Sequence, residues 1–296
     1  MYTQFFGNYL FSNGYVTKEQ LLSALSREAK TPIHFSTLAL FSGYMSAAEI
    51  EHVISLQEEE NKKFSELAIV YGYLTKDQVV ELLNDKKPDF LILGQILIDD
   101  GVFTYAEFEN ILTDYRSQTE FFDLELNDES KNDFHRLIDG FSIISEASIP
   151  EFGKSYLELF YNNLVRYIGD DFTSLPPSIC TEIATECCVS QMIDGPYVIN
   201  TYLNMDEATA IAFAERYSGE AFPVVDEYVI AAIEDILNLH NGLFIVNASN
   251  DNSNELSIGV IEHHQNSIIN FENLTFLFPI CYSFGIVYYI MEIVTL

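Results

Sequence analysis

The segment GYVTKEQL at residues 14–21 returns as GYMSAAEI at 43–50, GYLTKDQV at 72–79 and GVFTYAEF at 101–108. The leading glycines stand 29 residues apart, so the first 118 residues form a tandem repeat of one small unit. A Ser or Thr follows three positions after each glycine, and a Glu or Gln stands three positions later still. This spacing is the capping box, which marks the first turn of a helix. The pairs are Thr17 with Gln20, Ser46 with Glu49, Thr75 with Gln78, and Thr104 with Glu107.

Apolar residues flank each cap in the positions of a hydrophobic staple, one just before the cap and one four positions after it. They are Val16, Met45, Leu74 and Phe103 before the caps, and Leu21, Ile50, Val79 and Phe108 after them. Each glycine can take the left-handed conformation that closes the preceding helix. We therefore predict four helical hairpins, each of which needs a neighbour to bury its apolar side.

The composition excludes several classes of function. The chain has 296 residues, with 14 Lys plus Arg against 45 Asp plus Glu and a formal charge of −31. Such a charge repels phosphate backbones and anionic lipids, so we expect neither nucleic-acid binding nor membrane insertion. A secretory signal pattern is missing at the start, and the four cysteines form neither a CxxC pair nor a disulfide framework. These features predict a cytoplasmic protein.

The repeats share further positions, with Phe6-Gly7 and Leu10 in the first copy and Leu93-Gly94 and Leu97 in the fourth. This skeleton resembles the N-terminal repeats of type II secretion and type IV pilus assembly ATPases, some of which bind cyclic di-GMP. The resemblance places a basic residue first and Gln last in each repeat. The first position is Phe5, His34, Lys63 and Ile92 here, and the last is Glu28, Gln57, Lys86 and Tyr115. Because an anionic dinucleotide requires cationic partners, we predict no cyclic di-GMP binding. A structural module or a sensor of another ligand or partner stays open.

The remaining sequence predicts a connector over residues 119–150, with a helix near 134–141, and a second domain over 151–296. Helices are expected at about 151–168, 206–217 and 225–239, and strands at about 179–192, 197–204, 255–263, 270–280 and 283–294. The chain is therefore predicted as an α+β two-domain protein, all-α tandem helical hairpins followed by helices on an antiparallel sheet.

The predicted helix Val225–Leu239 has two distinct faces at ~100° per residue. Its apolar stripe contains Val229, Ala232, Ile233, Ile236, His240 and Leu243, and must face the sheet. Ala231, Asp235, Asn238 and Gly242 fall on the opposite side. Asp235 and Asn238 are neighbours on the helix surface because they are three residues apart. Small residues flank them, which lets another protein approach closely.

The order of Asp194-Gly195, Met205-Asp206-Glu207-Ala208 and the Asp235-to-Gly242 segment is similar to that of the CheX and CheC chemotaxis phosphatases. The resemblance covers roughly residues 151–296 and implies a CheX-like α/β domain that binds a response-regulator receiver domain. It also implies that Asn238 positions a water for attack on the receiver's aspartyl phosphate. Asp235 takes the place of a family Glu that pairs with a lysine of the receiver. Any metal ion, such as Mg²⁺, would come from the receiver, and no cofactor of this chain is expected.

Asp235 is shorter than the family's Glu by one methylene, roughly 1.5 Å. A misplacement of about 1 Å can lower a rate ~10²-fold, so the sequence leaves the phosphatase activity open. Glu234 lies i,i+4 from Asn238 and is the candidate substitute, although it points about 100° away from Asp235. The alternative is a non-catalytic adaptor of the same fold. The first helix of the domain lacks a second copy of the motif, so one site is expected.

Other candidates carry less weight. His263-His264 and Cys187-Cys188 are adjacent pairs that a strand directs to opposite faces, which argues against a shared metal. The segments 276–279 and 284–294 are apolar on both alternating faces. An exposed strand of that kind must be covered or must pair with another copy. We therefore expect a homodimer through the C-terminal sheet.

Overall fold

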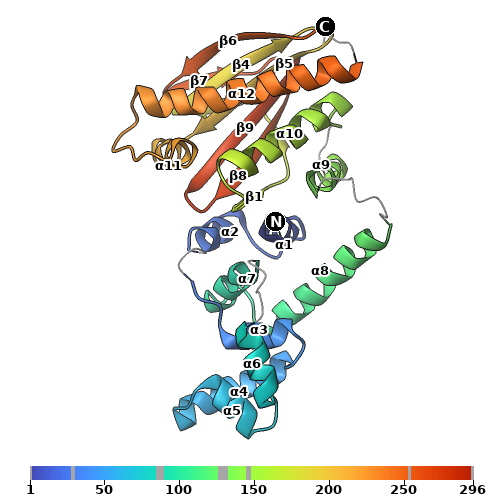
Figure 1. Ribbon diagram of the computed structural model, residues 1–296, viewed down its shortest axis with the longest axis vertical. Coiled ribbons are helices and arrows are strands. Elements are labelled where there is room, and N and C mark those ends of the chain that lie inside the picture. The colour runs from blue at the N-terminus through green and yellow to red at the C-terminus, as the bar shows by residue number, and fades with distance from the viewer. Residues whose placement is uncertain are drawn as a thin grey trace. The chain divides into compact units, whose positions relative to one another are not determined.

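The computed structural model describes residues 2–27, 31–84, 90–125, 133–144, 148–252 and 255–294 (Figure 1). The chain divides into two compact units, Tyr2–Glu129 and Ser130–Leu296. The first unit is helical and the second combines helices with an antiparallel sheet. The predicted fold class is therefore confirmed. The polar stretch 127–132, in the middle of the predicted connector, lies outside the described residues.

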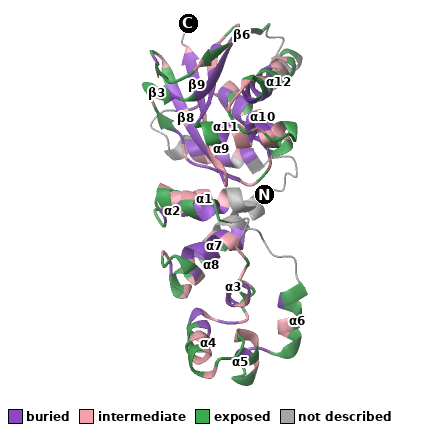
Figure 2. Ribbon diagram, turned by 90° about the vertical axis from the view of Figure 1, so that its left-hand side faces the viewer, coloured by how far each residue is buried: buried purple, intermediate pink, exposed green. Residues whose placement is uncertain are grey.

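The N-terminal unit consists of paired helices, one pair for each repeat. They are α1 (Tyr2–Ser12) and α2 (Lys18–Leu25), α3 (Phe35–Phe41) and α4 (Ala47–Glu60), α5 (Phe64–Val70) and α6 (Lys76–Asn84), and α7 (Phe90–Asp99) and α8 (Tyr105–Glu125). Figure 2 shows many exposed residues, in green, on α4, α5 and α6.

All four predicted capping boxes form. The Gln20 backbone N–H donates to Thr17 Oγ1 at 3.2 Å, and the Thr17 N–H donates to Gln20 Oε1 at 2.8 Å. The same reciprocal pair joins Ser46 with Glu49, Thr75 with Gln78, and Thr104 with Glu107. The four repeat glycines have φ between 68° and 78°, which side-chain-bearing residues rarely adopt. Each repeat is therefore built from the local signals in its own sequence.

The packing order of the repeats does not follow their order along the chain. The first repeat shares a core with the fourth, where the Phe6 and Phe90 rings lie 4.9 Å apart. Arg27 at the end of the first repeat pairs with Asp100 in the fourth. Gly94 has a steric role there, because a Cβ at this position would lie 2.2 Å from Phe108 Cζ. The Leu-Gly step of the fourth repeat therefore lets two helices meet closely.

The second unit has four helices, α9 (Asp133–Ile144), α10 (Glu151–Tyr167), α11 (Glu207–Ser218) and α12 (Glu227–Asn252). Helix α12 is longer than the predicted Val225–Leu239. It continues because His240 and Asn241, just past the predicted end, are buried in the interior rather than forming a polar stop. The helix extends to Asn252, and residues 253–254 lie outside the described part.

The main sheet has the strand order β1-β8-β9-β5-β4-β6, and β2 also pairs with β8. Its strands are β1 (Phe172–Ser174), β2 (Ser178–Ile179), β4 (Cys187–Asp194), β5 (Val198–Met205), β6 (Ser257–His264), β8 (Leu274–Tyr282) and β9 (Gly285–Val294). All the pairs are antiparallel. The single strand predicted over 179–192 is wrong. Its middle part, β3 (Glu182–Thr185), leaves the main sheet and pairs with β7 (Ser267–Asn270) as a separate ribbon.

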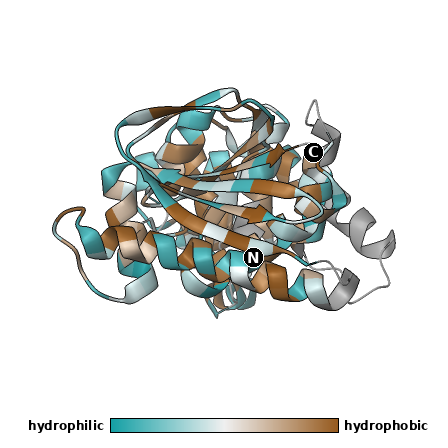
Figure 3. Ribbon diagram, turned by 90° about the horizontal axis from the view of Figure 1, so that it is seen from above, coloured by the Kyte–Doolittle hydropathy of each residue, from teal (hydrophilic) through white to brown (hydrophobic). Residues whose placement is uncertain are grey.

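One face of the sheet is covered by helices. Tyr289 of β9 packs against Phe160 of α10, with ring centroids 4.2 Å apart. Helix α12 lies over β4 and β6 (Figure 1). The opposite face holds a second cluster of Cys188, Tyr202, Phe271 and Ile290, with Ile183 and Ile269 of the ribbon packed on it. Figure 3 accordingly shows hydrophobic residues, in brown, on strands as well as on helices.

This topology corrects the reason given for a dimer. The apolar strands β8 and β9 are interior strands, paired on both sides, and neither is an exposed edge. The β3–β7 ribbon and the helices cover their two faces from within the chain. The strand that ends the sheet next to α12 is β6, where Val260 is 81% exposed. A homodimer that extended the sheet would therefore use β6 or the β1–β2 edge.

Among the described residues, the stretch Glu227–Ser249 of α12 has the length and apolar composition of a membrane span. Val229, Ile233 and Leu237 of this stretch are fully buried inside the unit. Burial as a core helix accounts for that composition.

Candidate functional site

Helix α12 presents the predicted candidate residues on its outer face. Its first turn is capped by Asp226, whose Oδ1 accepts from the Tyr228 and Val229 backbone N–H groups at 3.0 and 3.1 Å. Ala231, Asp235 and Asn238 are exposed and Gly242 is half-buried. Five of the six residues predicted to face the sheet are buried: Val229, Ala232, Ile233, Ile236 and His240. The sixth, Leu243, is 38% exposed.

Asp235 has a partner that the sequence did not suggest. The hydroxyl of Tyr217, on the neighbouring helix α11, donates a hydrogen bond to Asp235 Oδ2. Burial and this hydrogen bond raise the pKa of Tyr217 to about 12, so its hydroxyl keeps its proton and remains a donor. The carboxylate is thereby held on the helix surface with one oxygen engaged.

Glu234 is directed elsewhere. Its carboxylate pairs with His263 of β6, and its side chain is only 27% exposed. Glu234 therefore points toward the sheet edge and away from the face that carries Asp235. Of the two acidic residues, Asp235 is the one that an approaching protein would meet together with Asn238.

Asn238 is also held by a residue that sequence reasoning missed. Gln191 of β4 donates from Nε2 to Asn238 Oδ1 at 3.0 Å. Gln191 is only 3% exposed, although its strand is otherwise mainly apolar. The signal that could have revealed it is one long polar side chain in the run Cys187–Ile193. Assigning its partner requires the tertiary structure.

Gly242 leaves open space on the same face. A Cβ built on it would meet none of the described atoms beyond its own helix backbone within 4 Å, and its φ is not in the left-handed region. A glycine inside a helix costs about 1 kcal/mol relative to alanine. The described part of the unit therefore gives no steric reason for a glycine at this position.

The lower-ranked candidates have structural partners. His264 Nε2 lies 2.8 Å from Ser190 Oγ, while His263 pairs with Glu234, so the two histidines face different neighbours. Burial raises the pKa of Cys188 to about 12, which keeps this thiol protonated and unreactive. In the described ranges, no three His, Cys, Asp or Glu side chains gather as metal ligands.

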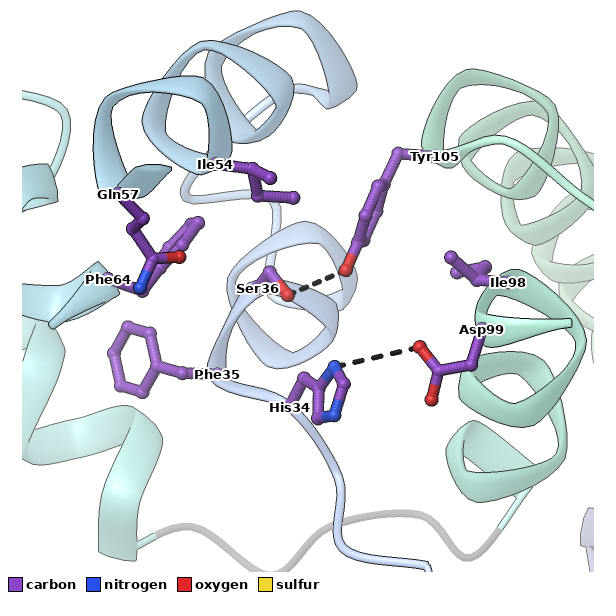
Figure 4. A pocket seen from close by; sticks show the side chains of 9 residues that line it. All are labelled: His34, Phe35, Ser36, Ile54, Gln57, Phe64, Ile98, Asp99 and Tyr105. Atoms are coloured by element: carbon purple, nitrogen blue, oxygen red, sulfur yellow. Dashed lines mark hydrogen bonds and ion pairs between the residues drawn. The ribbon is translucent and has the colours of Figure 1, made fainter. Parts of the chain in front are cut away.

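The repeat unit contains a pocket of about 480 Å³ (Figure 4). Its lining includes His34 and Gln57, the first and last positions of the second repeat. His34 Nδ1 lies 3.8 Å from Asp99 Oδ1, and Ser36 Oγ lies 2.8 Å from Tyr105 OH. The carboxylate opposes the imidazole, and none of the described residues that line the pocket is a Lys or Arg. This gives a physical reason to expect that an anionic dinucleotide is disfavoured.

No protein-family model matches the sequence, and none of the curated proteins matches it either. Solved structures of CheX- and CheC-like chemotaxis proteins are similar to the C-terminal half of the chain. A CheC-like superfamily protein from Shewanella sp. PV-4 is 15% identical, with 49% of this chain and 97% of that chain covered and a TM-score of 0.43. Chemotaxis protein CheX from Desulfovibrio desulfuricans is 12% identical, with coverage of 49% and 100% and a TM-score of 0.42.

A third structure is the complex of CheX with CheY, BeF3 and Mg²⁺ from Borrelia burgdorferi. It is 14% identical, covers 49% of this chain and 99% of its own, and has a TM-score of 0.43.

Proposed function

We propose that the second unit binds a response-regulator receiver domain and hydrolyses its aspartyl phosphate. Asn238 orients the attacking water, and Asp235 contacts a lysine of the receiver. The water oxygen attacks phosphorus, the bond between phosphorus and the aspartyl oxygen breaks, and the carboxylate leaves as inorganic phosphate is released. The receiver supplies Mg²⁺. Because an acyl phosphate is already reactive, positioning and charge stabilisation provide most of what the reaction requires.

The observation that carries the proposal is the exposed pair Asp235 and Asn238 between two small residues on one helix face. An amide and a carboxylate one turn apart can reach a reacting group together. Ala231 and the open space over Gly242 leave room for the receiver to approach the helix backbone. The choice of a receiver domain as the partner is supported by the resemblance of the sequence pattern to the CheX and CheC phosphatases.

The alternative is a non-catalytic adaptor that uses the same helix face. One observation favours it: the short Asp235 side chain is already engaged by Tyr217. A carboxylate that is both shorter and hydrogen-bonded reaches less far toward a partner's lysine. The two functions share a docking surface and differ in turnover.

Phosphate release separates them. Purified receiver domains from the same genome, phosphorylated with acetyl phosphate and freed of excess reagent, are mixed with the full chain, and phosphate is followed in time. We expect the parent protein to accelerate release from its cognate receiver. The Asn238→Ala variant should bind that receiver within a few-fold of the parent but lose most of the acceleration. Equal activity in Asn238→Ala would remove this residue from the mechanism, and binding without acceleration in the parent would favour the adaptor.

For the repeat unit we propose a sensing or partner-binding role. The pocket that His34, Gln57 and Tyr105 line supports it, because its mixed aromatic and polar walls suit a small uncharged group. We further propose that the protein acts in the cytoplasm as a homodimer. Light scattering of the full chain at high concentration tests the dimer, and a stable monomer would refute it.

A further inference from the structure

A chain of buried hydrogen bonds ends at Asn238. Tyr156 of α10 donates from its hydroxyl to Asn241 Oδ1. Asn241 donates from Nδ2 to Gln191 Oε1 at 2.9 Å, and Gln191 donates from Nε2 to Asn238 Oδ1 at 3.0 Å. Tyr156, Asn241 and Gln191 are each at most 3% exposed. The chain therefore runs from the interior to the proposed site.

The direction of these bonds is set by a backbone group. Gln191 Nε2 also donates to the carbonyl oxygen of Gly259 at 3.1 Å, and a carbonyl can only accept. The nitrogen end of the Gln191 amide must therefore face Gly259 and Asn238. It follows that Asn238 turns its oxygen inward, to Gln191, and its NH₂ group outward.

A β-bulge makes this arrangement possible. Between Gln191↔Ile261 and Ile193↔Ile258, β4 advances by two residues while β6 advances by three, so β6 carries one extra residue. A Cβ on Gly259 would lie 3.3 Å from the backbone oxygen of Met192, which shows how closely the strands approach at this point. Bulges of this kind redirect backbone and side-chain groups beside functional sites. Here the bulge lies at Gly259, whose carbonyl oxygen accepts from the Gln191 side chain.

Stability alone does not explain a glutamine at position 191. A buried amide must satisfy all its hydrogen-bonding groups, whereas an apolar residue of the same size needs none. The neighbours Val189 and Ile193, which share its side of the strand, are apolar and buried. Both N–H groups of Gln191 have acceptors, and one of these acceptors is a side chain on the outer face of α12.

We infer that Gln191 is a positioning residue that locks the Asn238 amide with its NH₂ group outward. The catalytic effect of this orientation rests on the proposed function. In the complex with the receiver, the attacking water or a phosphoryl oxygen would meet the NH₂ group of Asn238, which is a hydrogen-bond donor. An amide free to rotate would also present its oxygen, which cannot donate. Fixing the donor outward before docking contributes to catalysis because no reorientation is needed during the reaction.

The test measures the Asn238 side chain directly, in the full chain, by NMR of its NH₂ group. The signal is assigned by its loss in Asn238→Asp. In the parent, the heteronuclear NOE of this NH₂ group should be close to that of the α12 backbone. In Gln191→Met, which has similar length but no donor, the NOE should fall to the value of a mobile surface side chain.

Ser190→Ala is the matched control. Ser190 is the adjacent residue of β4 and is also buried, but its side chain lies on the opposite face of the strand. The variant loses one side-chain hydrogen bond, the one between Ser190 and His264. It should leave the Asn238 NOE and the dephosphorylation rate at the parent's values.

With an active parent, Gln191→Met should lower kcat about 10- to 100-fold and change KM for the receiver less than 3-fold.

The NMR result does not depend on turnover, so it separates this inference from the proposed function. If the parent does not release phosphate but Asn238 is rigid and loosens in Gln191→Met, the positioning stands and the phosphatase function fails. A mobile Asn238 in the parent, or an equally rigid one in Gln191→Met, overturns the inference. If Gln191→Met does not fold, Gln191→Leu, which also lacks the donor, takes its place, and a mobile Asn238 in the parent overturns the inference without any variant.

Discussion

Replacing Gly242 by alanine should stabilise the second unit. Position 242 lies well inside α12, has ordinary helical φ, and has open space where a Cβ would go. The gain is therefore the difference in helix propensity, about 0.8–1.0 kcal/mol, with no steric term to subtract. For a unit of this size that corresponds to a rise in Tm of about 2–4 °C. Differential scanning calorimetry of the full chain measures it.

Gly140→Ala is the matched control, because Gly140 also lies inside a helix, α9, and its Cβ would meet none of the described atoms beyond its own helix backbone within 4 Å. Both alanine variants should raise Tm to a similar extent. Gly242→Gln, which adds a long helix-favouring side chain on the outer face of α12, should remain folded but bind the receiver at least about 10-fold more weakly, a loss of roughly 1.4 kcal/mol. If Gly242→Ala lowers the Tm, position 242 does not have room for a side chain. If Gly242→Gln binds the receiver as tightly as the parent does, the receiver does not dock on this face of α12.

Three further outcomes are expected. Asp235→Glu restores the missing methylene and should raise the dephosphorylation rate. Tyr217→Phe removes the hydrogen bond to the Asp235 carboxylate and should also raise the rate. A lower rate in both variants would mean that the site depends on the shorter, hydrogen-bonded Asp235. Calorimetry of the full chain with cyclic di-GMP should show no binding, and micromolar affinity would contradict the prediction. Burial lowers the pKa of His240 to about 3, below its unfolded value of about 6.5. The unfolded state therefore binds the extra proton, and stability should fall as the pH drops from about 6.5 toward 3, by at most ~1.4 kcal/mol per pH unit from this group. His240→Asn should show a shallower pH dependence in urea titrations, and an unchanged slope would argue against a neutral, buried His240.

Part of the candidate site could be predicted because it depends on the geometry of a single helix. The spacing of Asp235 and Asn238 places them on one face whatever surrounds the helix, and burial of Val229 and Ile233 orients that face outward. The end of the same helix was predicted wrongly. Where a helix stops depends on what buries its next turn, and here His240 and Asn241 lie in the interior.

The amino-acid sequence by itself determined the four helical hairpins of the first unit. Each cap joins residues three apart, and each closing glycine acts on its own helix, so these features need no distant contact. The tertiary structure alone decided that the first repeat packs on the fourth and that β8 and β9 are interior strands. It also decided the partners of the site. Tyr217 reaches Asp235 across 18 residues, and Gln191 reaches Asn238 across 47. Such contacts follow from which strands pair and which helix lies over them, and periodicity along one element carries no information about that choice.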